Sequence, residues 1–347
     1  MTDARQPSRA RGRARPHPVL RMVAAVICLA VAGAGAFAGY KYYTLRPVYH
    51  FQTVPVVNGP PEVPAQASFN VLLIGSDQRP GDVAGHSDSL LLVHADLRDR
   101  RFNVLSIPRD TRVYMPGHGY TKLTSVQYVA QAELGKIPGI ERAVAAVQRL
   151  TGVDVNYYAV TNYWGLQGLV DAVGGIDMDI PFDVRLTHPW YPEDRGRVIR
   201  KGVHHLDGKM VTEVVHERDS LPEGDFSRQQ LQEEALKGIA RALLRPAGLV
   251  HLPEFVQQLP NFLIATNMST DDILSLALAA RGVDLDTQVH YYQVEGASQT
   301  LYDNILEQRN DQFVPNLERL RQVAQTYFTD ATEPGAETST PTRPQQP

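Results

Sequence analysis

Cysteine is almost absent from this sequence of 347 residues, which contains only Cys28. A single thiol excludes an intrachain disulfide, and it also excludes a metal site built from several cysteine ligands. The sequence has no Gly-x-Ser-x-Gly nucleophile motif, no phosphate loop ending in Gly-Lys-Ser or Gly-Lys-Thr, and no His-Glu-x-x-His motif. Three familiar catalytic classes therefore lack their signatures here.

Outside the N-terminal tail the net charge of the chain is negative. Residues 1–21 carry six arginines against the single Asp3, a net charge of +5, while the whole chain has −4, so the remainder sums to −9. Nucleic-acid binding needs Lys and Arg clustered on the folded body, so an acidic body argues against a nucleic-acid surface. The 43% apolar and 21% charged content is typical of a globular protein with one large or two ordinary domains.

Residues 22–40, MVAAVICLAVAGAGAFAGY, form an apolar run of nineteen residues without a charge. At about 1.5 Å per helical residue this run is long enough to cross a bilayer. Two interpretations are open, namely a cleaved signal peptide and a retained signal anchor. The length of the run and the tyrosines that follow it favour a single-pass anchor. The basic tail then stays cytoplasmic and the acidic body is extracytoplasmic, because positively charged flanks remain inside.

Composition divides the chain into five segments. Residues 1–21 are a cytoplasmic basic tail, 22–40 the transmembrane anchor, and 41–67 a juxtamembrane linker that contains NGPPEVPAQA. Residues 68–329 are predicted to form one folded region, and the Pro- and Thr-rich segment 330–347 is predicted to be disordered.

Short apolar runs bounded by turn residues predict strands that are buried on both faces. These runs are residues 69–75, 89–97 and 102–107. Residues 155–161, 175–181 and 289–294 are predicted to form further strands. Helical patterns lie between and after them, at residues 139–152, 163–175, 227–244 and 269–282. Strands interspersed with long helices predict a layered α/β domain, in which ligands bind where strand ends meet loops.

Carboxylates and arginines gather at the predicted strand ends. Asp77 follows the first strand and Asp88 precedes the second, so the two carboxylates approach each other if these strands are neighbours. A hard cation such as Mg²⁺ relieves the repulsion between them, and it binds one or two carboxylates together with substrate phosphates. Arg109 and Asp110 lie at the exit of the third strand.

Further arginines follow along the chain, and Arg228 and Gln232 share one face of a predicted helix. A guanidinium binds phosphate oxygens through two parallel hydrogen bonds, so several converging arginines beside one cation describe a pyrophosphate site. The alternative is a set of surface ion pairs, because Arg and Asp are common at strand ends.

The chain resembles the LytR–CpsA–Psr family of bacterial cell-envelope proteins in six segments that occur in this order: NVLLIGSDQR, SDSLLLVHAD, VLSIPRDTRVYMPGHGYTKLTS, YYAVTNYWGLQGLVDAVGGIDMDI, HLDGKMVTEVVHERD and DFSRQQLQ. The resemblance implies a mixed central β-sheet between helices, after one membrane anchor. It also implies a Mg²⁺-dependent phosphotransferase that moves a glycopolymer from a polyprenyl-pyrophosphate carrier to peptidoglycan or another cell-wall acceptor.

The resemblance assigns roles at the matching positions. It implies that Asp77 and Asp88 hold Mg²⁺. We further predict that Arg109 is catalytic and that a carboxylate such as Asp110 orients or deprotonates the acceptor hydroxyl. Contacts to pyrophosphate are implied for a larger set: Arg79, His86, Arg109, His216, Arg218, Arg228 and Gln232.

Three positions where the family has arginine carry other residues here: His86, His216 and Leu231. A neutral imidazole donates one hydrogen bond and carries no charge near pH 7. Charge-assisted hydrogen bonds contribute about 1.5–3 kcal/mol each, so the departures predict weaker pyrophosphate binding. A weakly catalytic or non-catalytic scaffold that binds polyprenyl phosphates is therefore the second hypothesis. A transcription regulator is a third, and the acidic body and the lack of a helix-turn-helix pattern argue against it.

Overall fold

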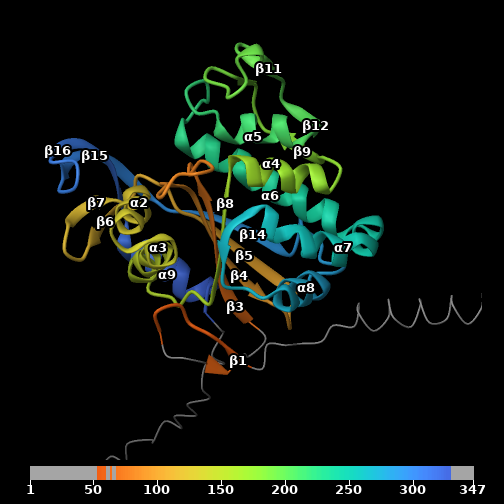
Figure 1. Ribbon diagram of the computed structural model, residues 1–347, viewed down its shortest axis with the longest axis horizontal. Coiled ribbons are helices and arrows are strands. Elements are labelled where there is room, and N and C mark those ends of the chain that lie inside the picture. The colour runs from red at the N-terminus through yellow and green to blue at the C-terminus, as the bar shows by residue number, and fades with distance from the viewer. Residues whose placement is uncertain (1–52, 60–62, 65–67, 330–347) are drawn as a thin grey trace, which may run out of the picture. The chain divides into compact units, whose positions relative to one another are not determined.

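The computed structural model in Figure 1 describes residues 53–59, 63–64 and 68–329. The predicted basic tail, membrane anchor and disordered tail lie outside these residues, as does most of the predicted linker. Across the three described ranges, no helix combines the length and the apolar character that a bilayer crossing requires.

A six-stranded mixed sheet forms the centre of the domain, with the order β13-β8-β3-β4-β5-β14. The pairs β8–β3 and β5–β14 are parallel, and the other three pairs are antiparallel. In that order the strands are Leu263–Thr266, Tyr157–Asn162, Ser68–Ser76, Ser87–Asp96, Arg101–Ser106 and Val289–Gln293. The expected mixed sheet between helices is confirmed, and five of its six strands coincide with predicted strands.

Alternate residues of β3 face opposite sides of the sheet, as the two-residue period of a strand requires. Leu72 and Ile74 join the main core, to which α2 (Leu123–Leu134), α3 (Lys136–Thr151) and α9 (Leu317–Tyr327) contribute. Phe69 and Val71 pack on the other side, where α8 (Thr270–Ala279) covers them. Figure 1 shows these two helical layers on either side of the sheet.

A second core lies beyond one end of the sheet. The predicted strand 175–181 forms β9 (Ile176–Ile180), which pairs with β12 (Gly202–Leu206) outside the central sheet. The helices α4 (Tyr163–Ala172), α5 (Gly208–His216) and α6 (Asp225–Leu244) surround this pair. Two short strands, β10 (Val184–Arg185) and β11 (Val198–Ile199), extend the same region, with a 3-10 turn at Pro192–Asp194.

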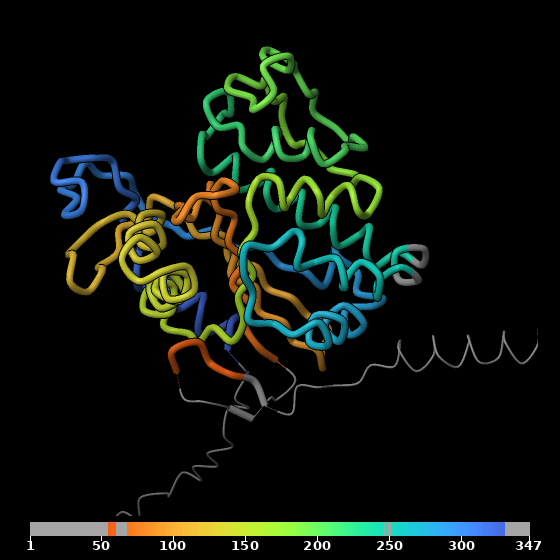
Figure 2. Tube along the Cα trace, viewed as in Figure 1, coloured from red at the N-terminus to blue at the C-terminus, as the bar shows by residue number. Residues whose placement is uncertain are grey.

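Two hairpins lie side by side at the edge of the domain (Figure 2). The first consists of β6 (Arg112–Met115) and β7 (Gly119–Lys122), and the second of β15 (Gly296–Asp303) and β16 (Gln308–Pro315). A backbone hydrogen bond of 2.9 Å from Asn304 to the carbonyl of Tyr120 joins them. The helix α7 (Pro246–Gln258) follows α6, and a 3-10 turn at Leu259–Asn261 leads from α7 to β13.

The folded region begins before the predicted boundary at residue 68. A short strand β1 (Thr53–Val54) pairs with β2 (Val63–Pro64). Val57 belongs to the main core, and its amide donates to the carbonyl of Val155 at 2.9 Å. Part of the predicted linker 41–67 is therefore integrated into the domain, because Val57 buries apolar surface against it.

Candidate functional site

A β-bulge places the side chain of Asp88 at one end of the sheet. The neighbouring strands β3 and β4 pair Gly75 with Ser89 and Ser76 with Ser87, so Asp88 is the extra residue. A bulge bends the strand locally and turns its side chain out of the regular alternation. Asp77 directly follows β3, as expected, while Asp88 lies within β4 and not before it. The two strands are neighbours, and the amide of Asp77 donates to the carbonyl of His86 at 3.3 Å.

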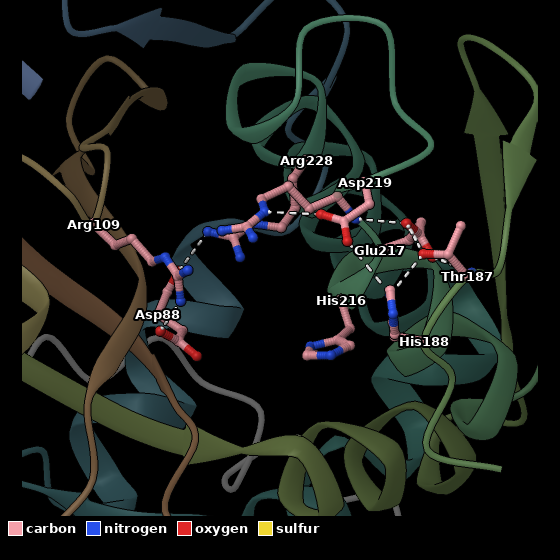
Figure 3. Close-up of a pocket in the computed structure, with 9 residues that line it drawn as sticks. Asp88, Arg109, Thr187, His188, His216, Glu217, Asp219 and Arg228 are labelled. Carbon is pink, nitrogen blue, oxygen red and sulfur yellow. Dashed lines mark hydrogen bonds and ion pairs between the residues drawn. The ribbon is translucent and has the colours of Figure 1, made fainter. Parts of the chain in front are cut away.

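Asp88 borders a cavity of about 320 Å³ between the end of the central sheet and the second core. Figure 3 shows the side chains that surround it. They come from β4, the loop after β5, the loop after β10, the end of α5 with the residues that follow, and α6. The lining residues are Asp88, Arg109, Thr187, His188, His216, Glu217, Arg218, Asp219 and Arg228. Five of them are predicted site residues, drawn together from segments that are distant in sequence.

Two arginines converge on Asp88. Arg109 Nη1 donates to Asp88 Oδ1 at 2.6 Å, and Arg228 Nη2 donates to the backbone carbonyl of Asp88 at 3.2 Å. The Nε atoms of both arginines are buried without a hydrogen-bond partner in the described part of the chain. Both guanidinium groups belong to residues that line the cavity, and such groups form strong charge-assisted hydrogen bonds to anions such as phosphate.

Burial affects the two guanidinium groups differently. For Arg109 burial opposes the charged form, but the adjacent Asp88 carboxylate outweighs it and the pKa is raised. For Arg228 burial is the dominant effect and lowers the pKa, although Asp225 opposes the shift through an ion pair of 2.5 Å. The ordinary pKa of arginine lies far above neutral, so both side chains remain cations at neutral pH.

Glu217 joins two segments that line the cavity, the loop after β10 and the residues after α5. Its buried carboxylate accepts hydrogen bonds from the amides of Thr187 at 2.6 Å, Arg218 at 3.0 Å and Ser220 at 3.1 Å. Burial opposes ionisation of Glu217, but these hydrogen bonds, led by that from Thr187, lower its pKa overall. The ionised carboxylate thereby fixes the loop after β10 against the end of α5.

His86 and Asp77 form a pair beside the cavity and do not line it. The carboxylate of Asp77 accepts from the amide of His86 at 2.6 Å and lies 3.0 Å from its Nδ1 atom. The imidazole stacks on the ring of Tyr128, with centroids 4.5 Å apart and planes 5° from parallel. The hydrogen bond with Asp77 raises the pKa of His86, and for Asp77 the bonds from His86 outweigh burial and lower the pKa.

Three other predicted residues also lie outside the cavity lining. Arg79 places its guanidinium carbon 5.1 Å from the ring centroid of Trp190. Gln232 accepts a hydrogen bond of 2.9 Å from the hydroxyl of Ser89. Asp110 forms an ion pair of 3.0 Å with Lys122.

Positions 216 and 231, where the family has arginine, differ in their surroundings. His216 lines the cavity, and burial, assisted by repulsion from Arg228, lowers its pKa, so the imidazole is uncharged at neutral pH. Leu231 is fully buried in the second core and does not reach the cavity. Leu231 therefore supplies no polar contact to this cavity.

Sequence reasoning missed four lining residues, namely Thr187, His188, Glu217 and Asp219. The first two lie in an irregular loop that has no hydrophobic period. Glu217 and Asp219 flank Arg218 in the segment HERD, so proximity to a predicted ligand was the available signal.

The carboxylates of Asp77 and Asp88 suit a hard cation. No group of three or more His, Cys, Asp or Glu side chains that could hold a metal occurs within the described ranges. Mg²⁺, however, is usually bound by one or two carboxylates together with waters and phosphate oxygens. Both carboxylates lie at the same end of the sheet, and each keeps a partly exposed side chain, so they fit a site that the substrate completes.

Comparison with known proteins gives consistent matches. A sequence model of the LytR_cpsA_psr family matches residues 47–326. The chain is 32% identical over 172 residues to a Bacillus cereus (strain AH820) protein named polyisoprenyl-teichoic acid–peptidoglycan teichoic acid transferase TagU. This alignment covers 50% of the chain and 52% of that protein, so the chain spans about half the length of the curated relative.

Solved structures share the fold. B. subtilis TagV superimposes with a TM-score of 0.63 at 24% identity, covering 76% of this chain and 97% of that one. The LytR-CPS2A-psr family protein YwtF (TagT), solved with bound octaprenyl pyrophosphate lipid, has a TM-score of 0.57 at 23% identity, with 80% and 96% coverage. At these identities the likeness establishes the fold.

Proposed function

The chain belongs to the LytR–CpsA–Psr family, and on this premise we propose that it is a glycopolymer phosphotransferase. The donor is a glycopolymer on a polyprenyl-pyrophosphate carrier, and the acceptor is peptidoglycan or another cell-wall polymer. The names of the relatives support this reaction, and one solved relative holds a polyprenyl pyrophosphate. The observation that carries the proposal is the cavity itself, in which Asp88 lies beside three arginines, Arg109, Arg218 and Arg228.

The geometry suits transfer at phosphorus. An acceptor hydroxyl oxygen forms a bond to the glycan-linked phosphorus, the bond from that phosphorus to the polyprenyl phosphate breaks, and the hydroxyl proton is released. Negative charge grows on the departing polyprenyl phosphate. Arg109 and Arg228 can neutralise this charge from fixed positions, and preorganised cations of this kind are worth most where charge develops.

The proton acceptor is not assigned by the cavity. Asp110, expected from the sequence to orient or deprotonate the acceptor hydroxyl, is held by Lys122 and does not line the cavity. We propose, from the resemblance and the chemistry of a carboxylate, that Asp110 orients or deprotonates the acceptor hydroxyl. Replacing Asp110 by Asn tests that role, because a base that takes the proton in the transition state contributes roughly 10²–10⁴-fold to the rate.

We propose that Asp77 and Asp88 hold Mg²⁺ together with phosphate oxygens of the donor. When bound, the cation supplies charge neutralisation and a fixed orientation for those oxygens. Arg109 shares the carboxylate of Asp88, so it lies where it can contact the same phosphate group. Proposed pyrophosphate contacts from the cavity wall are Arg109, His216, Arg218 and Arg228.

We further propose that residues 22–40 anchor the protein in the membrane, with the folded domain on the extracytoplasmic side. The uncharged nineteen-residue run and the basic residues before it support this arrangement. It would hold the domain at the surface where polyprenyl carriers reside. Protease treatment of intact cells tests it: the domain is expected to be degraded, and protection of the domain contradicts the orientation.

A transfer assay tests the proposed function directly. The purified full chain, a polyprenyl-pyrophosphate-linked glycan and a peptidoglycan acceptor are incubated with Mg²⁺, and glycan on the acceptor is measured. Transfer that disappears in Arg228→Ala supports the phosphotransferase. Tight donor binding without transfer favours the scaffold alternative, which the uncharged His216 at a family arginine position supports.

A further inference from the structure

Three aromatic rings pack together beside the cavity and form what we call the aromatic cluster. Tyr163 and Trp164 begin α4, and Trp190 lies in the loop after β10. The ring centroid of Trp190 is 4.9 Å from that of Tyr163 and 5.6 Å from that of Trp164. Trp164 keeps 39% of its surface exposed, so one broad apolar ring of the cluster faces solvent.

The aromatic cluster adjoins the cavity through His216 and through the loop after β10. The ring of Trp190 is 5.9 Å from the imidazole of His216, which lines the cavity. Thr187 and His188, a few residues before Trp190 in the same loop, line it as well. Arg79, a proposed pyrophosphate contact, also packs on Trp190, with its guanidinium carbon 5.1 Å from the ring centroid.

A buried carboxylate fixes the aromatic cluster in place. Glu213 is 1% exposed, and it accepts hydrogen bonds from the amides of Trp190 and Tyr191, both at 3.1 Å. It also accepts from the hydroxyl of Tyr163 at 3.2 Å. Two segments that are distant in sequence are thus held by one anion, so the exposed ring is presented on a preorganised support.

We propose that the aromatic cluster is a sugar-binding subsite on which a pyranose ring of the donor glycan stacks. The inference rests on the proposed function. The first sugar of the donor is bonded to the pyrophosphate, so it must lie beside the cavity when the pyrophosphate is bound. The C–H face of a pyranose is apolar and covers an aromatic ring, while polar groups at the rim, His188 and Asp219, can meet its hydroxyls.

Calorimetry with two probes tests the subsite. The full chain is titrated with geranyl pyrophosphate and with geranyl pyrophosphate that carries N-acetylglucosamine on its distal phosphate. Wild type should bind the sugar-bearing probe more tightly. Trp164→Ala should weaken only that probe, by roughly 2- to 10-fold, the range of a single aromatic contact, and Trp164→Phe should retain most of the affinity. Tyr302→Ala removes a similarly exposed ring, 48% exposed, on β15 and should change neither affinity.

Intrinsic fluorescence gives a second readout, because Trp164 and Trp190 are the only tryptophans of the chain. The sugar-bearing probe should change the emission of the wild type more than the bare probe does. A change of equal size with both probes contradicts the stacking.

The outcomes separate this inference from the proposed function. Failure of wild type to bind either probe refutes the proposed pyrophosphate site. Binding of both probes with equal affinity, or an equal loss of both in Trp164→Ala, overturns the sugar subsite alone. Trp164-dependent binding of free chitotriose at saturating geranyl pyrophosphate would assign the subsite to the acceptor and overturn the donor assignment.

Discussion

Arg109 and Asp88 are joined by a hydrogen bond of 2.6 Å between Nη1 and Oδ1 at the rim of the cavity. This bond links a proposed phosphate-binding cation to a proposed metal ligand. It forms because β4 and β5 are neighbours and because the bulge at Asp88 turns that carboxylate toward the loop after β5.

Replacing Arg109 by Ala should weaken binding of geranyl pyrophosphate by roughly 10- to 100-fold, because one or two charge-assisted hydrogen bonds to phosphate are lost. Calorimetry measures the change. Arg98→Ala removes an exposed arginine at the opposite end of β4 and should leave the affinity unchanged, which controls for net charge. Unaltered binding by Arg109→Ala would remove Arg109 from the proposed phosphate contacts.

Replacing Asp88 by Asn should abolish the effect of Mg²⁺ on ligand-induced stabilisation. In wild type, Mg²⁺ and geranyl pyrophosphate together should raise the Tm by more than the sum of their separate effects, because each completes the site of the other. In Asp88→Asn the Tm increase with both ligands should equal the sum of the increases with each ligand alone. Asp99→Asn alters an exposed carboxylate beyond the end of β4 and should behave as wild type. A synergy that persists in Asp88→Asn would argue against Asp88 as a ligand.

Asn162 connects the start of α4 to the loop that carries Asp77. Its Oδ1 atom caps the helix by accepting from the amide of Gly165 at 2.9 Å, and its Nδ2 atom donates to the carbonyl of Gln78 at 2.8 Å. Asn162→Ala should cost about 1–2 kcal/mol of unfolding free energy and should also raise the KM for the donor.

The matched control for Asn162 is Asn316, which caps α9 by accepting from the amide of Arg319 at 3.1 Å. Asn316→Ala should lower the unfolding free energy by a similar amount and leave the KM unchanged. Urea unfolding and donor kinetics measure the two effects. Equal KM values for both variants would show that Asn162 does not position the loop.

His94 should make the domain less stable in mild acid. The side chain is buried and within 2.9 Å of Asn70 Oδ1, and burial lowers its pKa from 6.5 to about 4, with Asp96 opposing the shift. Between these values the unfolded chain binds a proton that the folded chain does not, so unfolding becomes easier as the pH falls. The contribution between pH 8 and pH 5 is about 2 kcal/mol.

Urea unfolding at pH 8 and pH 5 checks this contribution. His94→Asn should lower stability at pH 8, because a packed ring is removed, but it should lose about 2 kcal/mol less than wild type on going to pH 5. An identical pH dependence in the two proteins would contradict a neutral buried His94.

Much of the sheet could be predicted because its strands are short apolar runs, and β3, β4 and β5 are buried on both faces. The helix α2 was missed for a physical reason. Four of its seven buried residues are polar, namely Thr124, Ser125, Gln127 and Gln131, so they obscure the short apolar stripe that this helix turns to the core. Gln127 instead accepts from the hydroxyl of Ser87, and Gln131 from the amide of Gly85, which supports the loop before β4.

The residues of the candidate site also divide into those that the sequence could predict and those that it could not. Asp88, Arg109 and Arg228 could be proposed from motifs, because residue type and place at a strand or helix end are properties of the sequence. The cavity wall at Thr187 and Glu217 could not, since the hydrogen bonds that bring these residues together join two loops of irregular backbone.

The sequence by itself determined the family, five of the six strands of the sheet and the acids and arginines near their ends, because each of these is encoded in a local run or motif. Only the tertiary structure decided which of them meet. In the folded protein Leu231 is buried in the second core, Asp110 forms an ion pair with Lys122, and Trp190 packs against Trp164. Such contacts join segments far apart in the chain, and the packing of α4, α5 and α6 beyond the end of the sheet sets their distances.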